Sequence, residues 1–259
     1  MEGFRNIVLT GASRGIGRAL AQQLAGPETR FCLIARTLKG LEETAKFCRS
    51  AGAEVEVFPL DVSDARSVSQ VLLDFDTRFP IDVVIANAGV SAGLEPGRQP
   101  EAEGVSAHIN AINFMGAVNT VEPLLAPMIG RKRGLIALVS SLAAVRPQPD
   151  MPSYSASKAG LRAYGIALRG ALRPLGVDVS IICPGFVTSD MSARHNGFKP
   201  FEIDAEHAAR IIARGIKRRR AHITFPWRLS ALIWLSNRFP ASASDWLIQG
   251  FKSKIDPEA

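Results

Sequence analysis

The stretch NIVLTGASRGIG, residues 6–17, combines the two patterns that decide the fold. Its first five residues are mostly apolar and include β-branched side chains, which predicts a short buried strand. The segment that follows, TGASRGIG (10–17), predicts a sharp turn and the start of a helix. Gly11, Gly15 and Gly17 let a ligand approach the backbone closely, and free N–H groups at a helix N-terminus bind phosphate. The stretch therefore predicts a phosphate-binding strand, turn and helix.

Outward from this unit, strand-like and helix-like segments alternate through most of the chain. The predicted strands cover 6–10, 31–35, 54–60, 82–86, 135–140, 178–183 and 221–225. The predicted helices cover 15–25, 40–51, 64–78, 103–129, 153–175 and 204–218. Regular alternation predicts βαβ units with right-handed crossovers. We therefore expect a doubly wound α/β fold, with a mainly parallel seven-stranded sheet and helices on both faces.

Composition and length favour one domain over residues 1–259. There is no internal repeat or Pro/Gly/Ser linker, and no apolar run reaches the roughly 18 residues of a membrane-spanning helix. The N-terminal segment lacks the features of a signal peptide. Cys32, Cys48 and Cys183 are scattered and odd in number, which predicts neither a disulfide framework nor a metal site. A cytoplasmic location is the natural expectation.

The formal net charge of +7 has two interpretations, attraction of an anionic ligand such as a nucleotide or an aid to solubility. The densest basic run, KRRR at 217–220, is typical of the solvated end of a helix, where cations also complement the helix dipole. No aromatic platform accompanies this run, so we do not expect binding to nucleic acid.

A second motif, YSASK at 154–158, places a tyrosine and a lysine four residues apart. On a helix these positions share a face. A nearby ammonium lowers the pKa of a phenol, so Tyr154 and Lys158 form a candidate acid/base pair. The alternative for these five residues alone is an ordinary helix with a solvated lysine.

Several motifs in order resemble those of the short-chain dehydrogenases/reductases, over roughly residues 4–226. They are TGASRGIG (10–17), LDV (60–62), NAG (87–89), YSASK (154–158) and PGFVTSDM (184–191). The glycine spacing, GxxxGxG, is that of the shorter, single-domain members rather than the GxGxxG of other dinucleotide-binding folds. The resemblance implies a Rossmann-like fold and hydride transfer between a nicotinamide and a carbonyl or alcohol carbon.

The resemblance also implies four catalytic residues. Tyr154 would act as general acid/base, and Lys158 would lower its pKa and bind the nicotinamide ribose. Ser141, chosen over its neighbour Ser140 by its distance from Tyr154, would hold the carbonyl oxygen. Asn113, chosen over Asn110 because NFMG fits the family pattern, would connect Lys158 to solvent through a helix irregularity and a water.

The same motifs, together with the second predicted strand, imply a set of cofactor-binding residues. They are Gly11, Ser13, Arg14, Gly15, Ile16, Gly17, Arg36, Asp61, Val62, Asn87, Ala88, Gly89, Tyr154, Lys158, Pro184, Gly185, Val187 and Ser189. In the family, a threonine at the place of Ser189 contacts the nicotinamide carboxamide. Ser189 keeps a hydroxyl there and Thr188 lies beside it, so either side chain could make this contact.

The cofactor is predicted to be NADP(H) rather than NAD(H). The second predicted strand ends in Ala35 and Arg36, with no acidic residue before Glu42 to bind a ribose 2′-hydroxyl. Arg36 and Arg14 can instead pair with a 2′-phosphate, as guanidinium groups do well. We therefore expect an NADP(H)-dependent carbonyl reductase or alcohol dehydrogenase. The alternatives are a sugar-nucleotide epimerase or dehydratase, and a cofactor-sensing protein without turnover.

The sequence says least about the identity of the substrate. Residues 188–205 are expected to form a lid, and its mixture of apolar and basic side chains favours an apolar substrate with a polar or anionic group. The apolar extension 227–259, with Trp227 and Trp234, has three interpretations: packing on its own domain, an interface in a homodimer or other homo-oligomer, or peripheral membrane contact near a lipid-like substrate.

Overall fold

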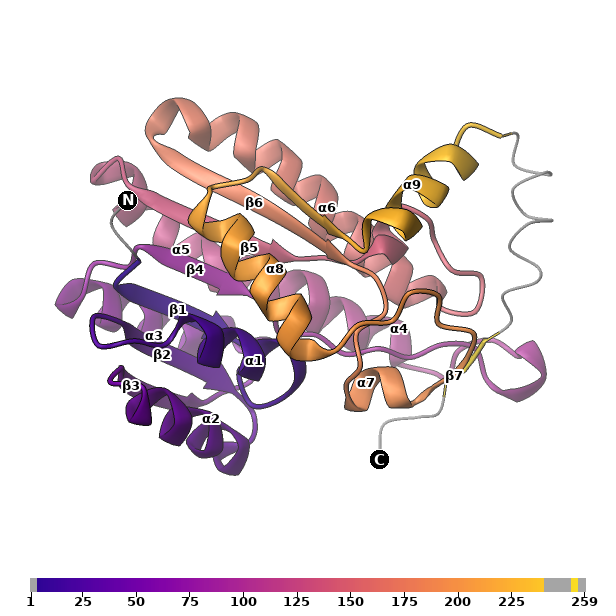
Figure 1. Cartoon of the computed structure of the whole chain (residues 1–259), viewed down its shortest axis with the longest axis horizontal. Helices are drawn as coiled ribbons and strands as arrows, with labels where there is room; N and C mark the ends of the chain where they lie inside the picture. The colour runs from indigo at the N-terminus through magenta and orange to yellow at the C-terminus, as the bar shows by residue number, and fades with distance from the viewer. Residues whose placement is uncertain (1–3, 240–252, 256–259) are drawn as a thin grey trace.

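The computed structural model describes residues 4–239 and the backbone of 253–255 (Figure 1). Its main sheet has seven strands in the order β3-β2-β1-β4-β5-β6-β8, and every neighbouring pair is parallel. The strands are β1 (Asn6–Thr10), β2 (Arg30–Ala35), β3 (Glu54–Pro59), β4 (Val83–Ala86), β5 (Gly134–Val139), β6 (Val177–Pro184) and β8 (His222–Phe225). The predicted seven-stranded, doubly wound sheet is confirmed.

Helices cover both faces of this sheet (Figure 1). One face packs against α1 (Gly15–Leu24), α2 (Leu38–Ser50) and α8 (Ala205–Lys217). The other packs against α3 (Ala65–Arg78), α5 (Gly116–Gly130) and α6 (Pro152–Leu172). Successive strand residues point to opposite faces, so Ile7 and Leu9 belong to the first core and Val8 to the second. This double burial explains why the strands are continuous apolar runs.

The long helix expected over 103–129 is interrupted in the structure. It consists of α4 (Val105–Asn110), a π-helical turn (Ala111–Met115, η2) and α5. A π turn inserts one residue into the helical repeat, and such turns occur frequently at functional sites. The irregularity expected near Asn113 is therefore present.

A small second sheet connects segment 188–205, which is expected to form the lid, with the C-terminal part of the chain. Within 188–205, the structure has the helix α7 (Asp190–Ala193) and the strand β7 (His195–Gly197). Strand β9 (Ser253–Ile255) pairs antiparallel with β7. The apolar extension begins as the helix α9 (Trp227–Ser236), and the remainder, 240–252 and 256–259, lies outside the described residues.

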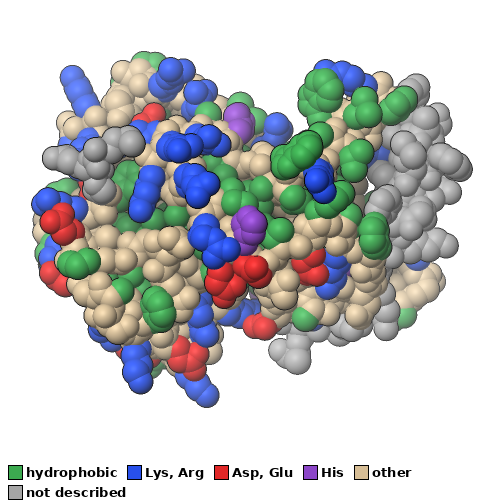
Figure 2. Space-filling model, viewed as in Figure 1, with side chains coloured by type: hydrophobic (Ala, Val, Ile, Leu, Met, Phe, Trp, Pro, Cys, Tyr) green, Lys and Arg blue, Asp and Glu red, His purple; other side chains and the backbone are tan. Residues whose placement is uncertain are grey.

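The surface agrees with the expectation for the basic run and shows where apolar side chains gather. The basic run 217–220 is exposed at the end of α8, as predicted. Figure 2 shows hydrophobic side chains gathered where α9 lies, at the upper right. No helix of the described residues is long and apolar enough to cross a membrane, and within the same part of the chain no cluster of His, Cys, Asp or Glu is arranged to hold a metal ion.

Candidate active site

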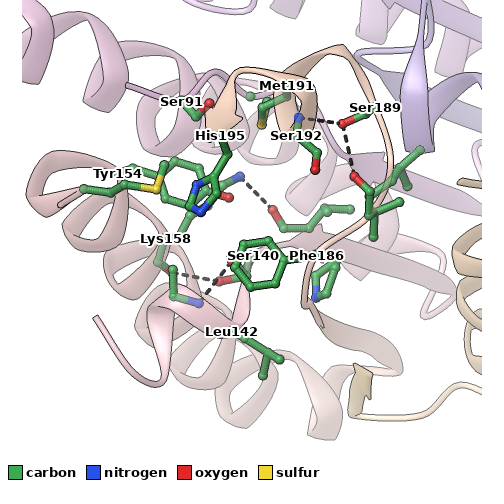
Figure 3. A pocket seen from close by; sticks show the side chains of 18 of the residues that line it. Ser91, Ser140, Leu142, Tyr154, Lys158, Phe186, Ser189, Met191, Ser192 and His195 are labelled. Carbon is green, nitrogen blue, oxygen red and sulfur yellow. Dashed lines mark hydrogen bonds between the residues drawn. The ribbon is translucent and has the colours of Figure 1, made fainter. Parts of the chain in front are cut away.

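A cavity of about 1220 Å³ opens at the carboxyl ends of the parallel strands (Figure 3). The carboxyl ends of β1 and β4, where the strand order reverses, both border it. This is where doubly wound sheets bind their ligands. Every residue predicted to bind the cofactor lines this cavity, and so does Ser141. The fold thus brings together segments that are far apart in the sequence.

The glycine turn after β1 has the shape of a phosphate cradle. Gly11 has a positive φ of 67°, and a Cβ added there would lie 2.8 Å from the Ala88 Cα. A Cβ on Gly17 would collide with the Gly11 carbonyl oxygen. No side chain caps the N-terminus of α1, and Gly15 and Ile16 of its first turn line the cavity. The N–H groups of this turn therefore suit a pyrophosphate.

Asn87, which follows β4, holds the turn in place. Its amide nitrogen Nδ2 donates to the carbonyl oxygens of Thr10 at 3.0 Å and Gly11 at 3.3 Å. Its backbone N–H, and that of Ala88, donate to the Thr10 hydroxyl at 3.1 Å. These bonds join β1 to β4, so Asn87 stabilises the cradle as well as lining the cavity.

Two charged residues lie at the end of the cavity that follows β2 and β3. Burial raises the pKa of Asp61, but hydrogen bonds from the Ser63 N–H and hydroxyl, with the positive charge of Arg36, outweigh it and hold the pKa below its ordinary value. Arg36 is exposed at the cavity wall. A guanidinium and a carboxylate are therefore presented together to whatever binds there.

Tyr154, Ser141 and Lys158 all line the cavity, and α6 contributes both Tyr154 and Lys158. Figure 3 shows these two side chains at the cavity wall. The pKa of the Tyr154 phenol is raised by burial, and a hydrogen bond with Ser141 opposes that rise. Ser140 has another role, since its hydroxyl donates to the Lys158 carbonyl oxygen at 2.8 Å and joins β5 to α6. Ser141 is thus the serine that contacts the phenol.

The sequence predicts that Lys158 lowers the pKa of Tyr154, and the structure does not show this effect. Its side chain is buried, and its ammonium donates to the Val139 carbonyl oxygen at 3.0 Å. Burial lowers the pKa of Lys158 itself to about 8. The ammonium is directed to a backbone oxygen, and burial is the largest influence on the pKa of the phenol. The pKa of Tyr154 is consequently raised, not lowered, in this structure.

Asn113 lies behind the cavity rather than on its wall. In the π turn, its side chain is fully buried and makes two bonds with Val90: Nδ2 donates to the carbonyl oxygen at 3.0 Å, and Oδ1 accepts from the N–H at 2.8 Å. Nδ2 also lies 3.0 Å from the Ser157 hydroxyl. A Cβ on Gly89 would be 3.1 Å from Asn113 Oδ1 and 3.2 Å from Lys158 Nζ, so Gly89 allows both groups to approach one point.

The lid presents Ser189 to the cavity, and the neighbouring Thr188 is exposed outside it. The Ser189 hydroxyl accepts from the Ser192 N–H at 3.1 Å and caps α7. Farther along the lid, the His195 ring is buried 5.2 Å from the Phe186 ring. Burial, with the charge of Lys199, lowers the pKa of His195 below its ordinary value.

Sequence reasoning did not assign several residues that line the part of the cavity expected to hold the substrate, here called the substrate half. Leu142, Arg146, Gln148 and Met151 come from the loop between Ser141 and Tyr154, while α9 contributes Leu229, Leu232 and Ile233. The loop was predictable, because it connects two assigned active-site residues. The contribution of α9 was not, because an apolar helix face has the same pattern whatever covers it.

Comparison with known proteins agrees with this geometry. A sequence model described as short chain dehydrogenase matches residues 5–199. An uncharacterized oxidoreductase of Myxococcus xanthus is 38% identical over 88% of this chain and 89% of that protein. The ketoacyl reductase HetN of Nostoc is 34% identical over 71% of this chain, which covers 64% of that relative's length.

Comparison with solved structures gives the same fold. The crystal structure of a short chain dehydrogenase/reductase from Burkholderia phymatum in complex with NAD superposes with a TM-score of 0.80, 24% identity and coverage of 99% of this chain and 98% of that one. At that identity the likeness concerns the fold alone. The family model and the Myxococcus relative each cover most of the chain, so this protein belongs to the short-chain dehydrogenase/reductase family of oxidoreductases.

Proposed function

We propose that the protein interconverts a carbonyl and an alcohol with NADP(H), using Tyr154 as general acid/base. The observation that carries this proposal is the meeting of Tyr154, Ser141 and Lys158 in the cavity that also contains the glycine turn. A bound nicotinamide dinucleotide would supply or accept the hydride. Proton transfer and charge stabilisation then remain for the side chains.

In the direction of reduction, the substrate oxygen gains negative charge and needs a proton. The raised pKa keeps the Tyr154 phenol protonated at neutral pH, as a proton donor must be. The Ser141 hydroxyl, which contacts the phenol, would redirect its single proton to the same oxygen and stabilise its developing charge. In oxidation Tyr154 acts as the base, and its raised pKa predicts that this direction is favoured at alkaline pH.

Lys158 and Asn113 act behind the phenol. Lys158 lies one helical turn from Tyr154 on α6 and would contact the ribose next to the reactive ring. With a pKa of about 8 it can exchange a proton near neutral pH. Asn113 holds Val90 and Ser157, and so fixes the wall against which Lys158 lies. We assign Asn113 a positioning role.

NADP(H) is proposed over NAD(H) because of Arg36 and Arg14. Both line the cavity: Arg36 directly follows β2, and Arg14 lies within the glycine turn. No acidic residue follows β2 directly. A guanidinium pairs well with a 2′-phosphate, whereas a ribose 2′-hydroxyl calls for an acceptor. Titration of both cofactors tests this: NADPH should bind more tightly, and Arg36→Asp should reverse the preference. Equal or tighter binding of NADH would contradict it.

The substrate is proposed to be an oxoacyl-type carbonyl compound, the class implied by the name of the Nostoc relative. The test follows NADPH absorbance with a panel of ketones, aldehydes and 3-oxoacyl thioesters. Tyr154→Phe should lower kcat/KM by about 10²- to 10⁴-fold, with NADPH binding retained. Near-normal turnover by that variant would remove Tyr154 from its role, and NADPH binding without turnover of any carbonyl would favour a cofactor-sensing protein.

A further inference from the structure

The cavity that contains Tyr154 also reaches α9, and the side chains that α9 contributes to it are apolar apart from one serine. At about 1220 Å³ the whole cavity exceeds the roughly 300–1,000 Å³ of typical small-molecule sites. The residues contributed by α9 and the segment directly after it are Leu229, Leu232, Ile233, Leu235, Ser236 and Phe239. None of these six is charged. The lid segment adds the apolar Met191 and Phe198 to the same cavity, and its polar contribution includes Arg194 and His195.

Helix α9 is packed at its start against the residues around the reactive centre. A Cβ on Gly185 would lie 2.9 Å from Pro226 Cδ and 3.3 Å from both Leu229 Cδ2 and Leu142 Cδ1. Leu142 directly follows Ser141, and Gly185 belongs to the segment proposed to contact the nicotinamide. The glycine therefore allows α9 to begin within van der Waals contact of the catalytic wall.

The other end of α9 is also attached to the rim of the cavity. The Asn237 amide donates to the Val145 carbonyl oxygen at 3.2 Å, in the loop that follows Ser141. With contacts at both ends, α9 has a defined position across the substrate half. Its cavity-lining residues can therefore form a wall of fixed shape.

The spacing of these residues gives that wall a direction. Leu229, Leu232, Ile233 and Ser236 are separated by three or four positions, so they form one face of α9. At a rise of 1.5 Å per residue this face is about 10 Å long. It begins beside Leu142 at the reactive centre and leads away from it. Leu232 keeps 57% of its surface exposed, so a ligand lying along the face would bury it.

We propose that this face of α9 binds a linear acyl chain of the substrate, whose carbonyl group lies at Tyr154. The inference rests on the proposed function and names the substrate class more narrowly. A peptide or sugar in this place would lose water from polar groups that the aliphatic side chains cannot bond, which is unfavourable. An alkyl chain needs no such partner and gains from every methylene that it buries.

The experiment measures kcat/KM with NADPH for 3-oxobutanoyl, 3-oxooctanoyl and 3-oxododecanoyl thioesters of N-acetylcysteamine. In the wild type, kcat/KM should rise about fourfold for each methylene buried against α9, through a falling KM. The comparison variants are Leu232→Gln and Ile233→Ala, on the cavity-lining face. The matched control is Trp234→Gln, since Trp234 is 59% exposed on the same helix and does not line the cavity.

We compare kcat/KM for the 3-oxododecanoyl thioester with kcat/KM for the 3-oxobutanoyl thioester. Leu232→Gln and Ile233→Ala should each lower the ratio of these two values about tenfold, as expected for lost methylene contacts. Trp234→Gln should leave this ratio unchanged. NADPH binding and the thermal unfolding midpoint, measured on each variant, show that the fold and the cofactor cradle persist. An equal loss in Trp234→Gln would overturn the proposal, because it would indicate a general effect of α9, such as membrane contact or subunit packing.

The outcomes also separate this inference from the proposed function. Suppose that the 3-oxobutanoyl thioester is reduced and that kcat/KM does not depend on chain length. This result would overturn acyl-chain binding by α9 but would leave the proposed reductase function standing. So would turnover of small ketones or aldehydes alone. Absence of NADPH oxidation with every carbonyl compound would instead defeat the proposed function, and the inference with it.

Discussion

The Nη1 atom of Arg14 lies 3.6 Å from the Oδ2 atom of Asp190, so an ion pair joins the glycine turn to the first helix of the lid. Both side chains are well exposed, which makes the pair weak. Its position gives it significance, because Arg14 is one of the two cations proposed to bind the 2′-phosphate. A carboxylate therefore stands beside the group that would distinguish NADPH from NADH.

The first prediction concerns this carboxylate. Asp190→Asn should strengthen NADPH binding about two- to fivefold, because removing an exposed charge interaction of this kind changes binding by roughly 0.2–1 kcal/mol. NADH binding should change less, since it lacks the 2′-phosphate. Fluorescence titration at low and high salt provides the measurement, and the gain should shrink as salt increases. Asp178→Asn, which breaks the exposed pair with Arg219, is the control. Equal changes for both cofactors would count against the assignment of Arg14.

The second prediction concerns the packing of the cradle. Gly17→Ala places a Cβ against the Gly11 carbonyl oxygen, so β1 and α1 must move apart. We expect the free energy of unfolding to fall by about 1–3 kcal/mol, with at least a tenfold loss of NADPH affinity. Gly26→Ala is the matched control, because nothing lies within 4 Å of its added Cβ. Urea unfolding and cofactor titration measure both effects, and similar behaviour of the two variants would refute the close approach.

The third prediction follows from the buried ammonium of Lys158. Its pKa is about 8 in the folded protein and 10.5 ordinarily, so between these values the unfolded chain binds more protons than the folded one. Stability then rises with pH over this window, and the burial penalty is fully present below pH 8. The whole effect is roughly 3 kcal/mol. Cofactor-free wild type should therefore gain stability relative to Lys158→Met between about pH 8 and about pH 10.

Urea unfolding of both proteins at several pH values across this window measures the difference. Lys158→Met removes the titrating group. The slope of its free energy of unfolding against pH therefore reports every other ionisation in the chain. Parallel slopes in the two proteins would show that Lys158 does not have the lowered pKa.

The fourth prediction concerns Asn113. Asn113→Ala leaves the Val90 N–H and carbonyl oxygen without their partner in a fully buried site. Each unsatisfied group costs about 1–3 kcal/mol, so thermal unfolding should occur at a clearly lower temperature, and kcat should fall as the wall behind Lys158 loosens. Asn110→Ala, one turn earlier, removes only an exposed bond to the Ser106 carbonyl oxygen. If Asn110→Ala were equally damaging, the positioning role of Asn113 would be untenable.

The fold could be predicted because its physical causes are local. Strands buried on both faces are continuous apolar runs, so β4 and β5 are visible in the sequence without knowledge of their neighbours. The glycines of the first turn are equally visible, because a close backbone approach excludes side chains. The residues predicted to bind the cofactor all line the cavity, and their binding roles stay predictions.

The features that were not predicted depend on tertiary contacts. The sequence places Lys158 one turn from Tyr154, but only the fold directs its ammonium to the Val139 carbonyl oxygen. The face of α9 that lines the cavity has the same apolar spacing as a subunit interface. Catalytic roles, subunit assembly and cellular location are not tested by these contacts and stay predictions.

The pairing of β7 with β9 makes the segment predicted to act as the lid one half of a two-stranded ribbon, whose other half comes much later in the chain. If this segment opens to admit substrate, the two strands either separate or move outward together. In the second case, a fluorescent probe attached at Ile255 would report each entry of substrate. A bulky fusion placed just behind that residue would then hinder turnover without touching a single group in the cavity.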